Sequence, residues 1–191
     1  FALIREEFLE SIRGAKEKRF PARRVLVTMG GADPDNATQK ALSALEETSL
    51  EGLELRVLVG GANPHQAKLS QYADSSRHEI EVLCNVHEMP PMYEWADAVI
   101  SAGGSTCWEW LAYGLSGAVV KIADNQEPVV VEFEKNNLAL MLGRCDDFCV
   151  HGWSAQLELW LSSESMYSDF LARRGIIDGC GADRVISAII S

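Results

Sequence analysis

The sequence predicts an α/β fold built on a Rossmann-like parallel sheet with helices on both faces. Short, β-branched apolar runs alternate with helical patterns of about ten residues, which is the signature of βαβ units joined by right-handed crossovers. Three of the runs end in a pair of glycines, as expected where a buried strand turns sharply toward a helix. The 191 residues are 47% hydrophobic and 24% charged, which suits one globular domain with a substantial core.

The first elements follow a charged amino-terminal stretch. Residues 1–24 are amphipathic and predict an interdomain linker that leads into a domain spanning 25–191. The apolar run 24–29 predicts a buried strand. Asp33 and Pro34 then offer a cap residue and a proline at the first helical position, and apolar residues recur on one face through 36–47, which predicts a helix.

The same unit repeats along the rest of the chain. Further strands are predicted at 53–59, 79–85, 98–101, 118–122 and 138–142, and helices at 64–73, 90–95, 105–113 and 127–137. From about residue 155 the pattern is helical to the end, with an interruption near Asp178 and Gly179. Nothing after residue 24 predicts a second domain boundary.

Composition excludes several classes of function. The 17 basic and 28 acidic residues give a net charge of −11, which disfavours nucleic acid and anionic membrane surfaces as partners. No apolar run approaches the roughly 18 residues of a membrane span. The chain begins at Phe1 rather than methionine, so we interpret it as a fragment of a longer protein.

The cysteines predict neither disulfides nor a metal site. An odd count of five without a dense framework is typical of buried thiols in a reducing cytoplasm. Cys145, Cys149 and His151 lack a further cluster that would complete a tetrahedral zinc site. The loop after the first strand is not GxGxxG and no acidic residue ends the second strand, which disfavours NAD. We therefore predict no cofactor.

Ligands of an open parallel sheet bind outside the carboxyl ends of its strands, and two glycine-rich loops are expected there. Gly30 and Gly31 would let the backbone approach a ligand, with a helix N-terminus offering N–H groups to an anion. The alternative is a tight turn with Asp33 as a helix cap. A second loop combines a diglycine, two hydroxyls and a helix start into a candidate diphosphate cradle; its residues are Gly103, Gly104, Ser105 and Thr106.

Glu109, one turn into the following helix, has two interpretations. Thr106 and Glu109 have the spacing of a capping box, in which the glutamate reaches back to the cap N–H. Alternatively, its carboxylate accepts hydrogen bonds from ribose hydroxyls, as an acidic residue does in dinucleotide-binding folds. The sequence leaves both interpretations open.

Two more loops carry polar side chains. Asn125 and Gln126 have amide donors and acceptors that suit sugar hydroxyls, although Asn125 or its neighbour Asp124 could instead cap a helix. The backbone around Val86 could read a base edge, and Met89 could pack against a flat ring.

The segment ISAGGSTCWEWLAYGL, followed by IADNQ, resembles the C-terminal domain of two-domain GT-B proteins. It is similar to the UDP-2,4-diacetamido-2,4,6-trideoxy-β-L-altropyranose hydrolases of pseudaminic acid synthesis, grouped with spore-coat polysaccharide (SpsG-like) proteins. VLVTMGGADPDNATQKAL and IDGCGADRV resemble further segments of that family. A more distant resemblance is to the MurG-type N-acetylglucosaminyltransferases.

The resemblance implies a cytoplasmic enzyme that holds UDP or a UDP-sugar between two domains. It implies diphosphate or sugar contacts at Gly30 and Gly31, uracil contacts at Val86 and Met89, phosphate contacts at Gly104, Ser105 and Thr106, ribose contacts at Glu109, and sugar contacts at Asn125 and Gln126. The catalytic histidine of that family lies in the N-terminal domain, so no catalytic residue is expected in this chain. A glycosyltransferase and a non-catalytic sugar-nucleotide module are the alternatives.

Overall fold

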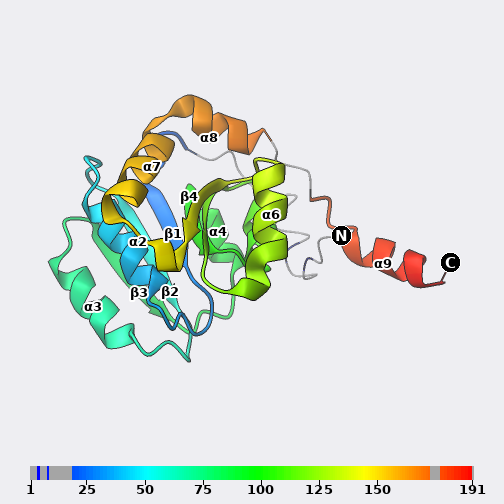
Figure 1. Cartoon of the computed structure of the whole chain (residues 1–191), viewed down its shortest axis with the longest axis horizontal. Coiled ribbons are helices and arrows are strands. Elements are labelled where there is room, and N and C mark those ends of the chain that lie inside the picture. The colour runs from blue at the N-terminus through cyan, green and yellow to red at the C-terminus, as the bar shows by residue number, and fades with distance from the viewer. Residues whose placement is uncertain (1–3, 5–7, 9–18, 173–176, 191) are drawn as a thin grey trace.

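The computed structural model describes residues 4, 8, 19–172 and 177–190 (Figure 1). Its centre is a parallel sheet of six strands in the order β3-β2-β1-β4-β5-β6. The strands are β1 Arg24–Thr28, β2 Glu54–Val59, β3 Glu79–Cys84, β4 Ala98–Ala102, β5 Ser116–Lys121 and β6 Leu140–Arg144. The strand order reverses between β1 and β4, as in doubly wound Rossmann-like folds. The predicted fold class is confirmed.

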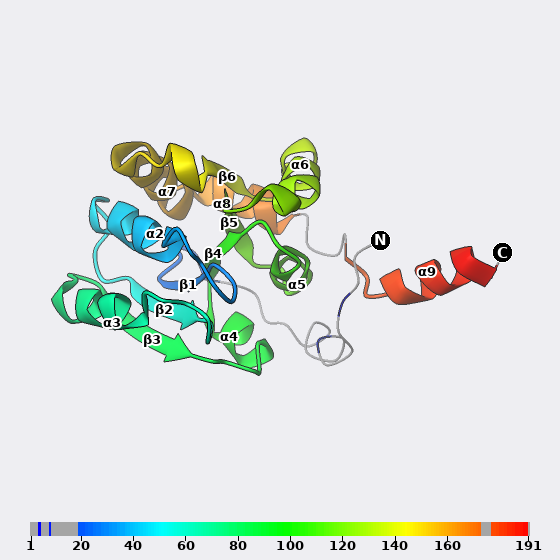
Figure 2. The same cartoon turned by 60° about the horizontal axis from the view of Figure 1, so that its bottom comes forward.

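Helices cover both faces of the sheet (Figure 2). One face carries α2 (Ala37–Glu46), α3 (Gln66–Ser75), α7 (Val150–Ser162) and α8 (Glu164–Leu171). The other carries α4 (Pro90–Trp95), α5 (Thr106–Ala112) and α6 (Glu127–Lys135). Short 3-10 turns precede α6 and α7, at Asp124–Gln126 and Cys145–Asp147.

The core lies in two layers, because successive strand residues point to opposite faces of a sheet. In β1, Val25 and Val27 belong to the first layer and Leu26 to the second, and all three are fully buried. Two buried tryptophans attach helices to these layers through their indole N–H groups. Trp110 donates to the Ser101 hydroxyl at 3.0 Å and Trp160 to the Ser116 hydroxyl at 2.8 Å.

Several predicted boundaries are wrong. The helix predicted to open at Pro34 begins at Ala37, because the intervening residues form a turn that ends in a left-handed Asn36. The helix predicted from about 155 begins at Val150, where packing of the buried Trp153 stabilises the first turn. The strand predicted at 118–122 begins at Ser116.

Gly117 explains the last of these differences. A Cβ at Gly117 would lie 2.3 Å from the Trp110 ring, so the glycine is needed for helix–strand packing within β5 rather than for a turn. The predicted strand 138–142 is also displaced, to Leu140–Arg144, beside a register shift between Val119 and Val120 of β5. The interruption predicted near Asp178 is present before α9 (Gly181–Ile190).

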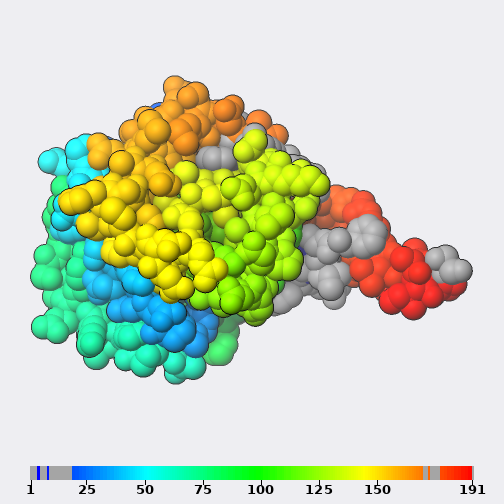
Figure 3. Space-filling model, in the orientation of Figure 1, coloured from blue at the N-terminus to red at the C-terminus, as the bar shows by residue number. Residues whose placement is uncertain are grey.

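The described residues near the two ends of the chain differ in how they pack against the α/β domain. Most of the predicted linker 1–24 lies outside the described residues. Within it, Phe8 is fully buried and packs against the rings of Tyr93 and Tyr113, with centroids 6.0 and 5.9 Å away. At the other end α9 projects from the body (Figure 3), and its Ile186, Ile189 and Ile190 are exposed.

Candidate functional site

The two predicted glycine loops lie on either side of the point where the strand order reverses. Thr28 near the end of β1 pairs with Ser101 near the end of β4, so the loops that follow these strands are neighbours. The next helices, α2 and α5, leave to opposite faces of the sheet. A crevice at such a switch point is where open parallel sheets bind their ligands.

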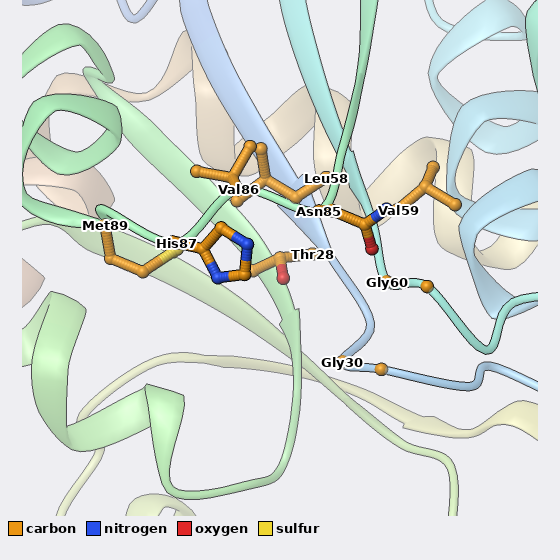
Figure 4. Close-up of a pocket in the computed structure, with 11 residues that line it drawn as sticks. Thr28, Gly30, Leu58, Val59, Gly60, Asn85, Val86, His87 and Met89 are labelled. Carbon is orange, nitrogen blue, oxygen red and sulfur yellow. The ribbon is translucent and has the colours of Figure 1, made fainter.

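A pocket of about 290 Å³ opens at the carboxyl ends of β1, β2 and β3 (Figure 4). It brings together four of the predicted site residues: Gly30, Gly31, Val86 and Met89. It also contains residues that the sequence did not single out as ligands, namely Thr28, Leu58, Val59, Gly60, Gly61, Asn85 and His87. The sequence feature that points to this part of the pocket is the Gly60-Gly61 pair after β2, because a diglycine lets the backbone approach a ligand, as at Gly30 and Gly31.

The pocket walls depend on close approaches between backbones. A Cβ at Gly60 would lie 2.3 Å from the Gly31 carbonyl oxygen, and a Cβ at Gly61 would lie 2.6 Å from the Asn85 amide oxygen. Asn85 itself has a φ of 53°, in the left-handed region that asparagine tolerates. The absence of side chains at Gly60 and Gly61 therefore lets the loops after β1 and β3 close around the pocket.

The N-terminus of α2 is occupied by a side chain of the protein. The buried Asp33 carboxylate accepts hydrogen bonds from the backbone N–H groups of Ala37 at 2.7 Å and Thr38 at 3.0 Å. Asp33 therefore satisfies two N–H groups of the first turn of α2, as the capping interpretation predicts, but the N-cap residue is Asn36, whose Oδ1 accepts from the Gln39 N–H at 3.3 Å. Any ligand contact at Gly30 and Gly31 therefore comes from close backbone approach and not from the α2 terminus.

The other two predicted loops are neighbours of each other. A Cβ at Gly103 would lie 3.5 Å from the Gln126 side-chain oxygen, which accepts a hydrogen bond from the Ile122 N–H at 2.9 Å. A Cβ at Gly104 would meet no atom within 4 Å. Ser105 is exposed and its hydroxyl makes no capping bond to α5. The structure thus places the candidate diphosphate loop beside Gln126, with Asn125 exposed next to it.

Glu109 is half-buried and held by a tyrosine. Its Oε2 accepts a hydrogen bond from the Tyr93 hydroxyl at 3.0 Å. The N-cap of α5 is Ser105, so Glu109 is the fourth helical residue and Thr106 the first. A capping box requires the glutamate at the third position, so that interpretation of Thr106 and Glu109 is wrong.

The last residues of β5 and β6 are cations, and both form ion pairs with carboxylates. Lys121 of β5 forms ion pairs with Asp124 at 3.6 Å and with Glu127. Arg144 of β6 contacts Asp124 at 3.2 Å and Asp146 at 3.3 Å. The hydrogen bond from Arg144 lowers the pKa of the Asp124 carboxyl. Asp124 is therefore an ion-pair partner next to Asn125 and Gln126.

Among the described residues, no group of three or more His, Cys, Asp or Glu side chains is arranged to hold a metal ion. No helix in the described part of the chain is long and apolar enough to span a membrane.

The sheet order and the loops at its switch point define a domain of the kind that forms the C-terminal half of GT-B glycosyltransferases. Acinetobacter baumannii MurG shares this fold with a TM-score of 0.63 at 18% identity, over 87% of this chain and 47% of MurG. The structure of S. aureus MnaA with UDP matches with a TM-score of 0.63 at 13% identity, over 97% of this chain and 48% of that protein.

The sequence profile of the glycosyltransferase family 28 C-terminal domain matches residues 24–146, and the chain belongs to this family. It is 24% identical over 172 residues to the spore coat polysaccharide biosynthesis protein SpsG of Bacillus subtilis (strain 168). That alignment covers 87% of this chain and 50% of SpsG, so the chain spans about half the length of this curated relative. The predicted resemblance to SpsG-like and MurG-type proteins is confirmed.

Proposed function

We propose that this chain is the UDP-binding half of an enzyme that acts on a UDP-sugar, with residues 25–191 as the binding domain and 1–24 as its linker. The observation that carries the proposal is the meeting of glycine-rich loops at the switch point of a GT-B-type sheet, beside the half-buried carboxylate of Glu109. The family match and the presence of UDP in the MnaA structure support it.

The proposed ligand runs across the carboxyl edge of the sheet. Uracil occupies the pocket beside Val86 and Met89, with Gly30 and Gly31 approaching the diphosphate or sugar. Glu109 accepts hydrogen bonds from the ribose hydroxyls. The backbone and hydroxyls of 103–106 bind the diphosphate, and Asn125 and Gln126 face the sugar.

The proposed reaction of the whole protein is hydrolysis, in which water replaces UDP on the sugar to give the free sugar and UDP. This chain would stabilise the leaving diphosphate with fixed backbone donors and orient the nucleotide. The GGSTCWE and ADNQ segments, which resemble the hydrolases of pseudaminic acid synthesis, support this assignment. The catalytic histidine would belong to the other half of the protein.

Sugar transfer to a hydroxyl acceptor is the second candidate, favoured by membership of glycosyltransferase family 28. The relationship to SpsG supports a role in surface-polysaccharide synthesis for either reaction. An assay of UDP release by the longer protein distinguishes the two reactions. Release of UDP from a UDP-sugar without an acceptor supports hydrolysis, and release that requires an acceptor contradicts it.

Calorimetric titration of the 191-residue chain tests the UDP site. We expect weak binding of UDP, with UMP binding more weakly because it lacks the second phosphate. Gly104→Ala is the diagnostic variant, since the added methyl meets no protein atom within 4 Å and occupies the space next to the proposed diphosphate. It should reduce UDP affinity without lowering the unfolding temperature. No heat at millimolar UDP, or unchanged affinity in Gly104→Ala, would contradict the assignment.

A further inference from the structure

We infer that Tyr93 is a positioning residue that orients the Glu109 carboxylate for recognition of the ribose, a role that rests on the proposed UDP site. The Tyr93 hydroxyl donates to Glu109 Oε2 at 3.0 Å. Tyr93 is fully buried, whereas Glu109 is half-buried at the carboxyl edge of the sheet. The tyrosine therefore reaches the carboxylate from inside the protein.

The phenol ring of Tyr93 is held on two sides. Its ring centroid lies 5.2 Å from that of Tyr113 and 6.0 Å from that of Phe8. Such aromatic contacts favour particular ring orientations, and full burial limits the movement of the ring further. The hydroxyl of Tyr93 is thus positioned before any ligand arrives, and so is the Glu109 carboxylate oxygen that accepts its hydrogen bond.

Helix α4 connects this bond to the pocket. Its N-cap is Met89, which lines the pocket, and the Tyr93 N–H donates to the Met89 carbonyl oxygen at 3.1 Å. Tyr93 is therefore one helical turn from Met89 and one hydrogen bond from Glu109. A base and its ribose are separated by a fixed covalent distance, so this connection holds the two proposed contact points at a constant spacing.

The energetic consequence is pre-organisation. A carboxylate that is already oriented loses less conformational freedom when a ribose hydroxyl donates to it. Hydrogen bonds to ionised groups are also stronger than neutral ones. Loss of the Tyr93 hydroxyl should therefore weaken the ribose contact specifically, and leave contacts to the base and the phosphates unchanged.

A purely structural role makes a different prediction. If the hydroxyl only satisfies a buried polar group, its removal lowers stability and weakens every nucleotide equally. Tyr167→Phe is the matched control, because Tyr167 is also buried and donates to the Asp97 carbonyl oxygen at 2.7 Å. Tyr167 packs in the core layer on the opposite face of the sheet from Tyr93.

The experiment measures the dissociation constants of UDP and 2′-deoxy-UDP for five proteins: the unmodified chain, Tyr93→Phe, Glu109→Gln, the double variant of these two, and the control Tyr167→Phe. We expect the unmodified chain to prefer UDP, and Tyr93→Phe to reduce that preference by about threefold or more, with 2′-deoxy-UDP affinity unchanged. The double variant should lose no more discrimination than Glu109→Gln alone, because the two groups act as one unit. Tyr167→Phe should keep the full preference.

The outcomes separate this inference from the proposed function. If the unmodified chain discriminates but Tyr93→Phe discriminates equally well, the positioning role is overturned and the UDP site stands. Equal losses for both nucleotides in Tyr93→Phe would also overturn it, in favour of the structural role. If the unmodified chain does not bind UDP, or does not distinguish the two nucleotides, the proposed ribose site fails and the inference fails with it.

Discussion

Gly60→Ala tests whether the loops around the pocket are as close as the structure shows. The added Cβ would lie 2.3 Å from the carbonyl oxygen, 2.4 Å from the Cα and 2.7 Å from the carbonyl carbon of Gly31. Favourable contacts between carbon atoms need about 3.5–4.0 Å, so one backbone segment has to move by roughly an ångström. All three contacted atoms are backbone, so no side chain can rotate away.

The expected cost of this substitution follows from overpacking. Forcing extra atoms into a packed site destabilises a protein by about 1–3 kcal/mol, and we expect the free energy of unfolding to fall by that amount. Movement of the Gly31 segment also displaces one wall of the pocket. UDP affinity should therefore fall together with stability.

Urea unfolding followed by circular dichroism, with a parallel UDP titration, measures both effects. Gly31→Ala is the matched control, because a Cβ there meets no atom within 4 Å and should leave the free energy of unfolding unchanged. If Gly60→Ala unfolds with the same free energy as the unmodified chain, the close approach of the two loops is wrong.

Three further predictions follow from other contacts. Asp33→Ala should lower the free energy of unfolding by about 1–2 kcal/mol in urea titrations, because two N–H groups of α2 lose their acceptor; unchanged stability would contradict the capping role. Burial raises the pKa of the Cys107 thiol to about 12, so its stabilising contribution is complete below about pH 9 and falls as the pH rises toward 12; unfolding temperatures between pH 8 and 10.5 should fall less steeply in Cys107→Ala than in the unmodified chain. UDP affinity should hold or rise as salt increases, because a net charge of −11 repels an anion and salt screens that repulsion; a steep loss of affinity in salt titrations would contradict this.

The arrangement of the sheet was predictable because apolar runs and turns are local signals. Buried strands such as β4 (Ala98–Ala102) are continuous apolar runs, and parallel strands place all the following loops at one edge. Contacts between segments that are distant in the sequence produce no local sequence pattern. The predicted strand 118–122 left Gly117 out, although Gly117 lies within β5 and makes room for the Trp110 ring.

The same limit applies to the candidate site. The glycine loops were visible in the sequence, but the contact between Gly60 and Gly31 joins two loops that follow different strands. Tyr93 and Glu109 lie on different helices, and nothing in their spacing predicts a hydrogen bond between them. The sequence therefore offered the chemistry of each loop separately, and the fold determined which residues meet.

The ion pairs at the carboxyl edge indicate what kind of group can neutralise a diphosphate there. Lys121 and Arg144 are both engaged with carboxylates, and Asp124 is shared between them. If a phosphate bound to Lys121 or Arg144, a carboxylate would have to be displaced or would remain close to a second anion. Either change costs free energy. Backbone N–H groups carry no such competing partner charge. A loop with empty space at Gly104 therefore suits the proposed diphosphate better than Lys121 and Arg144 do.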